Sequence, residues 1–118
     1  PESAGKELAR LAKLYDFSFF EYWVSDYAGH KQDMPWAVKQ LETFDGVLKG
    51  LLANWDMSND LILLTSDHGN MEDLGTRKHT AAPVPLLLFG DKTKRDAFKD
   101  VSSLTEIAPA ISSSLQLD

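Results

Sequence analysis

The feature that most constrains the fold of this chain is an alternation between helical and strand-like apolar patterns. Apolar residues at three- and four-residue steps predict helices at Ser3–Leu14, at Met34–Trp55 and from Ser103 or Thr105 toward Leu115. Short aromatic or aliphatic runs predict strands at Phe17–Val24, Leu61–Ser66 and Val84–Phe89. Strands separated by helices usually pair in parallel, with helices on both faces. The order therefore predicts an α/β fold with a mostly parallel sheet.

Individual residues refine these boundaries. Asp33 is a candidate cap for the Met34–Trp55 helix, and Pro35 suits the first turn of that helix. Pro109 falls inside the last helical pattern and predicts a kink or a late start. The Val84–Phe89 strand follows a loop instead of a helix, so we expect it either to run antiparallel or to lie at an edge of the sheet.

The composition excludes several classes of partner and site. The 118 residues carry 12 Lys and Arg against 18 Asp and Glu, which gives a formal charge of -6. We therefore expect no nucleic-acid partner and no membrane partner, because the chain lacks a basic surface and an apolar run of bilayer length. The absence of cysteine excludes disulfides and thiolate metal ligands. No secretory signal is visible, so a cytoplasmic location is expected.

All three histidines stand close to carboxylates or in the loop that follows them. Asp26 precedes His30 by four residues, Asp67 directly precedes His68, and His79 comes later in a polar loop. If the first two strands are parallel, both carboxylate segments end at the same sheet edge, and the loop with His79 can fold back over it. Each piece alone also fits a turn residue beside a surface histidine. Their common location favours a site for a divalent metal.

Three motifs and the last helical pattern resemble the alkaline phosphatase superfamily. The motifs are Asp26-x-x-Gly29-His30, then Ser66-Asp67-His68-Gly69-Asn70, then His79-Thr80 followed by Pro83-Val84-Pro85. The stretch Leu104–Ile111 is similar to the final helix of such domains. The similarity is greatest to the metalloenzyme branch, which holds cofactor-independent phosphoglycerate mutase and phosphopentomutase. The resemblance runs from about Phe17 onward, and it implies that residues 1–118 are the C-terminal half of a three-layer α/β/α catalytic domain.

The resemblance also implies a set of metal ligands. Asp26, His30 and His79 would bind a first divalent ion, and Asp67 and His68 would bind a second, with Mn²⁺ or Zn²⁺ as the metal. Two neighbouring ions can clamp the attacking and leaving oxygens of a phosphoryl displacement. The Ser or Thr nucleophile of the family, and the early aspartate that completes its second site, match no position here. Both are expected upstream, so no catalytic nucleophile is assigned and the chain alone is expected to be inactive.

Three further polar residues are candidate contacts to a substrate phosphate. They are Asn70, Arg77 and Lys31. Each of them also fits a solvated loop group, which is the commoner role of such residues.

The function implied by the resemblance is phosphoryl transfer, by a phosphomutase (an isomerase) or a phosphatase (a hydrolase) that forms a covalent phospho-enzyme. The implied partners are a small phosphorylated substrate and the N-terminal remainder of the same domain. Two alternatives stay open. One is a relative of phosphodiesterases, nucleotide pyrophosphatases or sulfatases, and the other is a non-catalytic metal-binding α/β domain. The chemistry of the upstream nucleophile would separate them.

Overall fold

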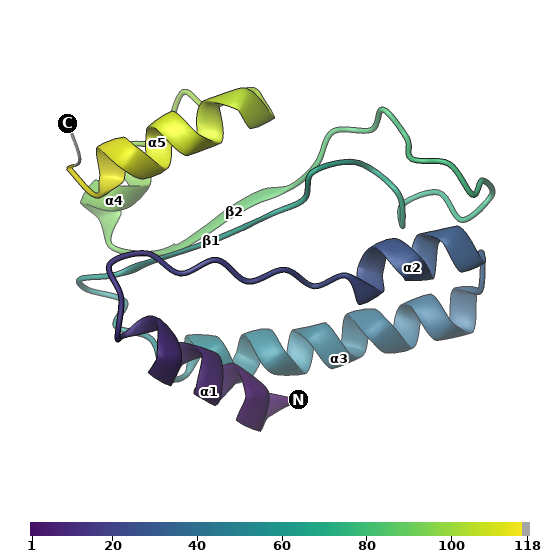
Figure 1. Cartoon of the computed structure of the whole chain (residues 1–118), viewed down its shortest axis with the longest axis horizontal. Helices are drawn as coiled ribbons and strands as arrows, with labels where there is room; N and C mark the ends of the chain where they lie inside the picture. Colours follow the sequence, from purple (N-terminus) through teal and green to yellow (C-terminus); the bar gives the residue numbers. More distant parts are fainter. Residues whose placement is uncertain (117–118) are drawn as a thin grey trace. The chain divides into compact units, whose positions relative to one another are not determined.

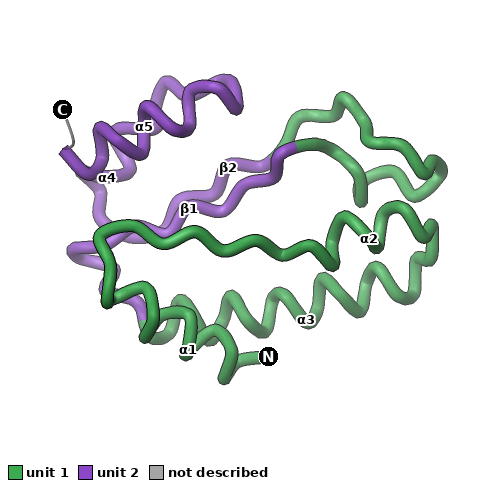
Figure 2. Tube along the Cα trace, viewed as in Figure 1, with its two compact units in different colours: residues 1–54, 68–84 green, residues 55–67, 85–118 purple. Residues whose placement is uncertain are grey.

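The computed structural model describes residues 1–116, which form two compact units (Figure 2). Unit 1 comprises Pro1–Asn54 and His68–Val84, and unit 2 comprises Trp55–Asp67 and the chain from Pro85 onward. The elements in order are α1 (Glu2–Ala12), α2 (Val24–Lys31), α3 (Met34–Leu52), β1 (Leu61–Thr65), β2 (Leu86–Gly90), α4 (Lys92–Asp96), the 3-10 helix η1 (Leu104–Glu106) and α5 (Ile107–Ser114) (Figure 1). No helix in this described part is long and apolar enough to cross a membrane.

Unit 1 is built on the crossing of α1 with α3, and glycine lets the two helices approach closely. A Cβ atom on Gly5 would overlap the carbonyl oxygen of Val47 and would lie 2.5 Å from the backbone nitrogen of Leu51. A Cβ atom on Gly50 would overlap the carbonyl oxygen of Glu2 in the same way. Glycine in α3 weakens the isolated helix, but here it creates the contact surface. The buried apolar side chains of this unit are Ala9, Ala28 and Ala37.

The expected start of α3 is confirmed. The Asp33 side chain accepts a hydrogen bond from the backbone N–H of Trp36 at 3.0 Å, and Pro35 lies in the first turn, where a missing N–H costs nothing. The helix ends at Leu52 rather than Trp55. The predicted first helix is also confirmed, as α1.

The strand expected at Phe17–Val24 is wrong. Residues 16–22 have no regular secondary structure, and α2 begins at Val24. Within residues 1–116, no other strand supplies backbone hydrogen bonds to residues 17–21, and an apolar pattern cannot form a strand without a neighbour to pair with. The aromatic side chains stay open, with Phe19 80% and Trp23 75% exposed. As a consequence, Asp26 lies in the first turn of α2 and not at the end of a strand.

Unit 2 contains a sheet of two antiparallel strands. Residues Leu61–Thr65 of β1 pair with β2 in a register that puts Leu63 opposite Leu88. The antiparallel alternative for the strand after the loop is thus confirmed, whereas a mostly parallel sheet is not confirmed in the described part of the chain. The register ends at Gly90, whose φ of 121° and close approach to Asp60 both require glycine.

The last part of unit 2 is helical and begins with a capping box. Ser103 accepts from the backbone of η1, and the Glu106 side chain reaches back to the N–H of Ser103 at 3.0 Å. Pro109 is the third residue of α5, in a turn whose N–H groups need no helical acceptor. The late start expected from this proline is therefore confirmed. The short helix α4, which was not anticipated, is capped by Asp91 through the N–H of Lys94 at 2.8 Å.

Candidate metal centre

Helix α2 sets two of the predicted ligands on one face. Asp26 and His30 are four residues apart, so their side chains lie one above the other along the helix. His30 Nε2 is 3.4 Å from Asp26 Oδ1. The spacing that looked like a loop motif in the sequence is therefore a helical i,i+4 pair.

The polar loop after β1 brings the other two histidines to this face. The backbone N–H of Thr80 donates to the carbonyl of Gly69 at 2.9 Å, and the two residues form an isolated antiparallel bridge. This bridge closes the loop so that the rings of His68 and His79 stack, with centroids 3.5 Å apart and planes 15° apart. Residues 11 positions apart in the sequence thus act as neighbours.

Three imidazole rings converge on one carboxylate oxygen, Asp26 Oδ1. Asp26 Oδ1 lies 3.3 Å from His79 Nε2 and 3.8 Å from His68 Nε2, while the Nε2 atoms of His30 and His79 are 3.3 Å apart. Asp26, His68 and His79 each offer a ligand atom within 4.8 Å of the others. All four residues belong to unit 1, and none of the four is fully buried.

The donor set fits a divalent cation. His30 Nδ1 is 2.7 Å from the carbonyl oxygen of Arg77, which can only accept, so Nδ1 carries the hydrogen and Nε2 keeps its lone pair for the cluster. Fixing the far nitrogen of a ligating histidine in this way is the usual support for metal binding. Imidazole nitrogen combined with carboxylate oxygen suits zinc and manganese alike.

Asp67 belongs to unit 2, whereas His68, the next residue, belongs to unit 1. Its role as a ligand of a second ion, together with His68, stays a prediction.

The three candidate phosphate contacts lie at different depths. Asn70 is 5% exposed and donates to Asp26. Arg77 is exposed and donates from Nε to Gln32 Oε1 at 3.0 Å. The Lys31 ammonium lies 5.0 Å from the ring centroids of both Tyr27 and Trp36. Their contact with a substrate stays a prediction.

Glu72 is a supporting residue that the sequence reasoning missed. Its carboxylate accepts the backbone N–H of Asn70 at 2.6 Å and the hydroxyl of Thr80, so it joins the two arms of the histidine loop. The Thr80 hydroxyl, followed by backbone N–H donors, holds the pKa of Glu72 below its usual 4.5. An acid two residues after the Asp-His-Gly-Asn block, with a hydroxyl beside the last histidine, was the available clue.

Gln32 ties the same loop to the end of α2. It has a left-handed backbone with φ of 55°, and its side chain donates to the carbonyl of Leu74 at 3.1 Å. It also accepts from Arg77, whose own carbonyl holds His30. The loop is therefore anchored to α2 beside the cluster as well as within it.

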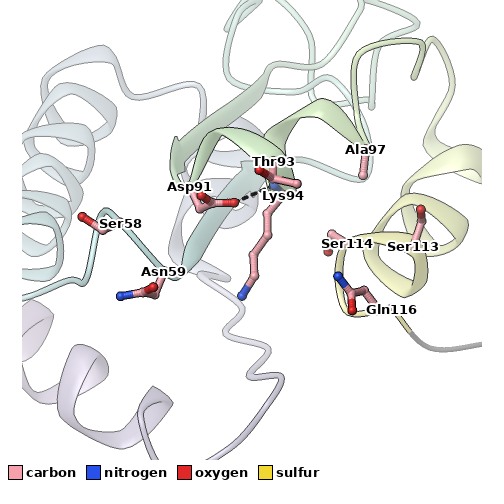
Figure 3. A pocket seen from close by; sticks show the side chains of 9 residues that line it. All are labelled: Ser58, Asn59, Asp91, Thr93, Lys94, Ala97, Ser113, Ser114 and Gln116. Carbon is pink, nitrogen blue, oxygen red and sulfur yellow. Dashed lines mark hydrogen bonds between the residues drawn. The ribbon is translucent and has the colours of Figure 1, made fainter.

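A polar hollow of about 490 Å³ lies in unit 2 (Figure 3). Asp91 and Lys94 lie on one side of it and Ser113, Ser114 and Gln116 on the other. The Asp91 carboxylate is already used to cap α4, and the Asn59 amide donates to Asp56 at 2.8 Å. These polar groups therefore serve local structure.

Known proteins resemble this chain over most of its length. The model of the Metalloenzyme superfamily matches residues 2–118. The 2,3-bisphosphoglycerate-independent phosphoglycerate mutase of Yersinia pestis (strain Pestoides F) is 31% identical over 111 residues, which cover 88% of this chain and 21% of the mutase. The enzyme of the same name from Desulforudis audaxviator is 31% identical over 121 residues, covering 94% of this chain and 24% of that protein. The one from Antithamnion sp. is 29% identical over 106 residues, covering 84% and 21%.

These relatives are much longer than the chain, which spans about a fifth of the length of the first ones (21%). No solved structure matches it. The family match covers nearly every residue, and the motifs that carry the resemblance to the alkaline phosphatase superfamily fall inside it. This chain belongs to the Metalloenzyme superfamily, the alkaline phosphatase-like α/β family that includes the phosphoglycerate mutases.

Proposed function

We propose that this chain supplies most of the metal ligands of a phosphoryl-transfer enzyme of the phosphoglycerate mutase type. The observation that carries the proposal is the convergence of three imidazole rings on Asp26 Oδ1. The Nε2 atoms of the three histidines lie 3.3–3.8 Å from that oxygen. Neutral imidazoles gain little from facing one another and a carboxylate across such distances. A cation among them would satisfy all of their lone pairs.

Asp26, His30 and His79 would hold a first ion, and Asp67 and His68 a second. The closeness of His68 to Asp26, at 3.8 Å, supports a paired site, in which the ligands of adjacent ions lie side by side. When bound, such ions stabilise the alkoxide of the nucleophile and the charge that develops on the transferred phosphoryl group. We favour Mn²⁺ or Zn²⁺ on the basis of the donor atoms.

The chain's own residues would prepare this site. The Arg77 carbonyl keeps the hydrogen of His30 on Nδ1 and so directs Nε2 to the cluster. The Gly69–Thr80 bridge holds the two loop histidines in one plane-to-plane stack. Arg77 and Lys31 are exposed; Lys31 follows His30 in α2, and the Arg77 carbonyl contacts the His30 ring, so both would meet the phosphate of a small substrate.

The hydroxyl nucleophile and the rest of the sheet would come from the remainder of the same domain. The length of the relatives supports this, since the chain covers only 21% of the Yersinia enzyme. The open aromatic segment supports it independently. Residues 17–21 have no backbone partner within residues 1–116, and Phe19 and Trp23 are largely exposed. We propose that the remainder of the domain pairs with this segment and converts it to a strand. The segment would then belong to the parallel sheet of a three-layer α/β/α domain.

The test is metal analysis of the longer protein that carries this chain. We expect about two Mn²⁺ or Zn²⁺ ions per molecule, fewer in His79→Ala, and loss of 2-phosphoglycerate to 3-phosphoglycerate interconversion in the same variant. Asp96→Ala is the matched control, because Asp96 is an exposed acid that pairs only with surface lysine, at 2.8 Å from Lys92 Nζ. A wild-type protein that retains no divalent metal would refute the proposal.

A further inference from the structure

Asn70 is the only buried polar side chain in the part of the chain that the structure describes, at 5% exposure. Buried amides normally use all their hydrogen-bonding groups. Here Nδ2 donates twice, to Asp26 Oδ1 at 2.6 Å and to the Asp26 carbonyl at 3.0 Å, while Oδ1 has no partner. The orientation of the amide is fixed, because the opposite one would set oxygen against oxygen. A buried acceptor without a partner costs stability, so stability alone does not explain why this amide is buried here.

Helix α2 has a glycine, Gly29, at the point where this amide packs against it. A Cβ atom on Gly29 would overlap Asn70 Oδ1 and Cγ and would lie 2.8 Å from Nδ2. Gly29 has no positive φ, so its backbone does not require glycine. The glycine of the Asp26-x-x-Gly29-His30 motif is therefore explained by the side chain of Asn70.

Asn70 is itself held by the loop that carries the histidines. Its backbone N–H donates to Glu72, and Glu72 accepts the hydroxyl of Thr80, the residue after His79. A continuous set of hydrogen bonds therefore runs from the Asp26 carboxylate through Asn70 and Glu72 to the His79 arm. The Asp26 side chain is 46% exposed, so its position is not fixed by burial. The Asn70 amide donates a hydrogen bond to its carboxylate.

We propose that Asn70 is a positioning residue that fixes the Asp26 carboxylate toward the histidine cluster, and that Gly29 exists to make room for it. The inference deepens the proposed function, on which it rests. It gives Asn70 a role in orienting a ligand instead of contacting the substrate. Partners that orient a ligating carboxylate typically contribute about 10- to 100-fold in metal affinity.

The first test is a Co²⁺ titration of this chain, followed by visible absorption, with Asn70→Leu as the variant. Leucine keeps the approximate shape against Gly29 but donates no hydrogen bond. We expect Co²⁺ affinity to fall about tenfold or more and the absorption bands to change, while the chain stays folded with an unfolding midpoint lowered by the loss of the hydrogen bond to Asp26. Unchanged Co²⁺ affinity and spectrum in Asn70→Leu would overturn the inference.

Asn54→Leu is the matched control. Asn54 is also a partly buried amide in unit 1, and it donates to the carbonyl of Gly50 at 2.8 Å, within α3 and its C-terminal turn. We expect this variant to lose stability with no change in Co²⁺ affinity. A comparable loss of affinity in both variants would show that the effect of Asn70 is only structural.

A second, metal-free measurement separates this inference from the proposed function. In the apo chain, a side-chain amide proton of Asn70 should resonate downfield because it donates to a carboxylate, and Asp26→Ala should remove that shift. An unaltered resonance would refute the positioning role. If the wild-type chain fails to bind Co²⁺ at millimolar concentration while the resonance does respond, the proposed metal site fails for this chain and the Asn70–Asp26 contact stands.

Discussion

Gly29→Ala should destabilise unit 1, although alanine is the better helix former. The substitution gains about 1 kcal/mol in an ordinary helix. Here the new Cβ would overlap two atoms of the Asn70 amide and lie 2.8 Å from the third, against 3.4 Å or more in ordinary contact. Asn70 must move away, and its short hydrogen bond to the Asp26 carboxylate is lost. Overpacking costs about 1–3 kcal/mol and a lost hydrogen bond to a charged group about 1.5–3 kcal/mol, so after the helix gain a net loss of about 1.5–5 kcal/mol is expected.

The assay is a double-mutant cycle by urea unfolding of the metal-free chain. In the Asn70→Ala background the obstacle is absent, so Gly29→Ala should become neutral or stabilising by up to about 1 kcal/mol. The sign of the effect therefore reverses between the two backgrounds. Equal effects in both backgrounds would refute the reasoning, because they would show that Asn70 does not occupy the space beside Gly29.

Three further outcomes follow from other parts of the structure. Gly5→Ala should cost about 1–3 kcal/mol in urea unfolding, because its Cβ would overlap the Val47 carbonyl, and a neutral result would contradict the helix crossing. Glu106 has a pKa lowered below 4.5 by backbone N–H donors, so its stabilising contribution is present above pH 4.5 and is lost as the pH falls through the folded value. Glu106→Gln should therefore flatten the acid limb of the stability profile, and an unchanged limb would argue against the capping box. Gln32→Gly relaxes a left-handed residue but removes the bond to the Leu74 carbonyl, so amide exchange in residues 74–77 should accelerate at little cost in global stability.

Local chemistry made the helix starts predictable. Asp33 with Pro35, and Ser103 with Glu106, act through atoms only a few residues apart, so the pattern alone determines the outcome. The short helix α4 was not predicted, because five residues are too few to show a helical period of apolar positions.

The strand at Phe17–Val24 could not be predicted correctly because a strand depends on a partner elsewhere in the chain. The residues whose pattern is typical of a covered strand stay open because no strand within residues 1–116 pairs with them. The aromatic pattern is typical of a strand that is paired and covered on both faces, and residues 1–116 provide neither the pairing strand nor the cover.

Four of the five predicted ligands lie close together in the structure, but the reason for their convergence differed from the expected one. Asp26 was expected at the end of a strand, whereas a helical i,i+4 step sets it beside His30. The supporting residues escaped because their contacts span 44 positions, as between Asn70 and Asp26, and no local pattern records such a contact. The candidate ligands could still be named, because their choice depended on aspartate and histidine being suitable metal donors and not on whether Asp26 lies in a strand or a helix.

The open aromatic segment also has a consequence for handling the chain in solution. Residues 17–21 have no backbone partner within residues 1–116, and the rings of Phe17, Phe19 and Phe20 are exposed, so a second molecule with the same segment can pair with it edge to edge. Glu21 is the one charge in this stretch, and like charges brought together in register oppose such self-association. The solubility of the isolated chain therefore depends heavily on this single charge, and a Glu21→Gln variant should form cross-β aggregates more readily than the wild-type chain.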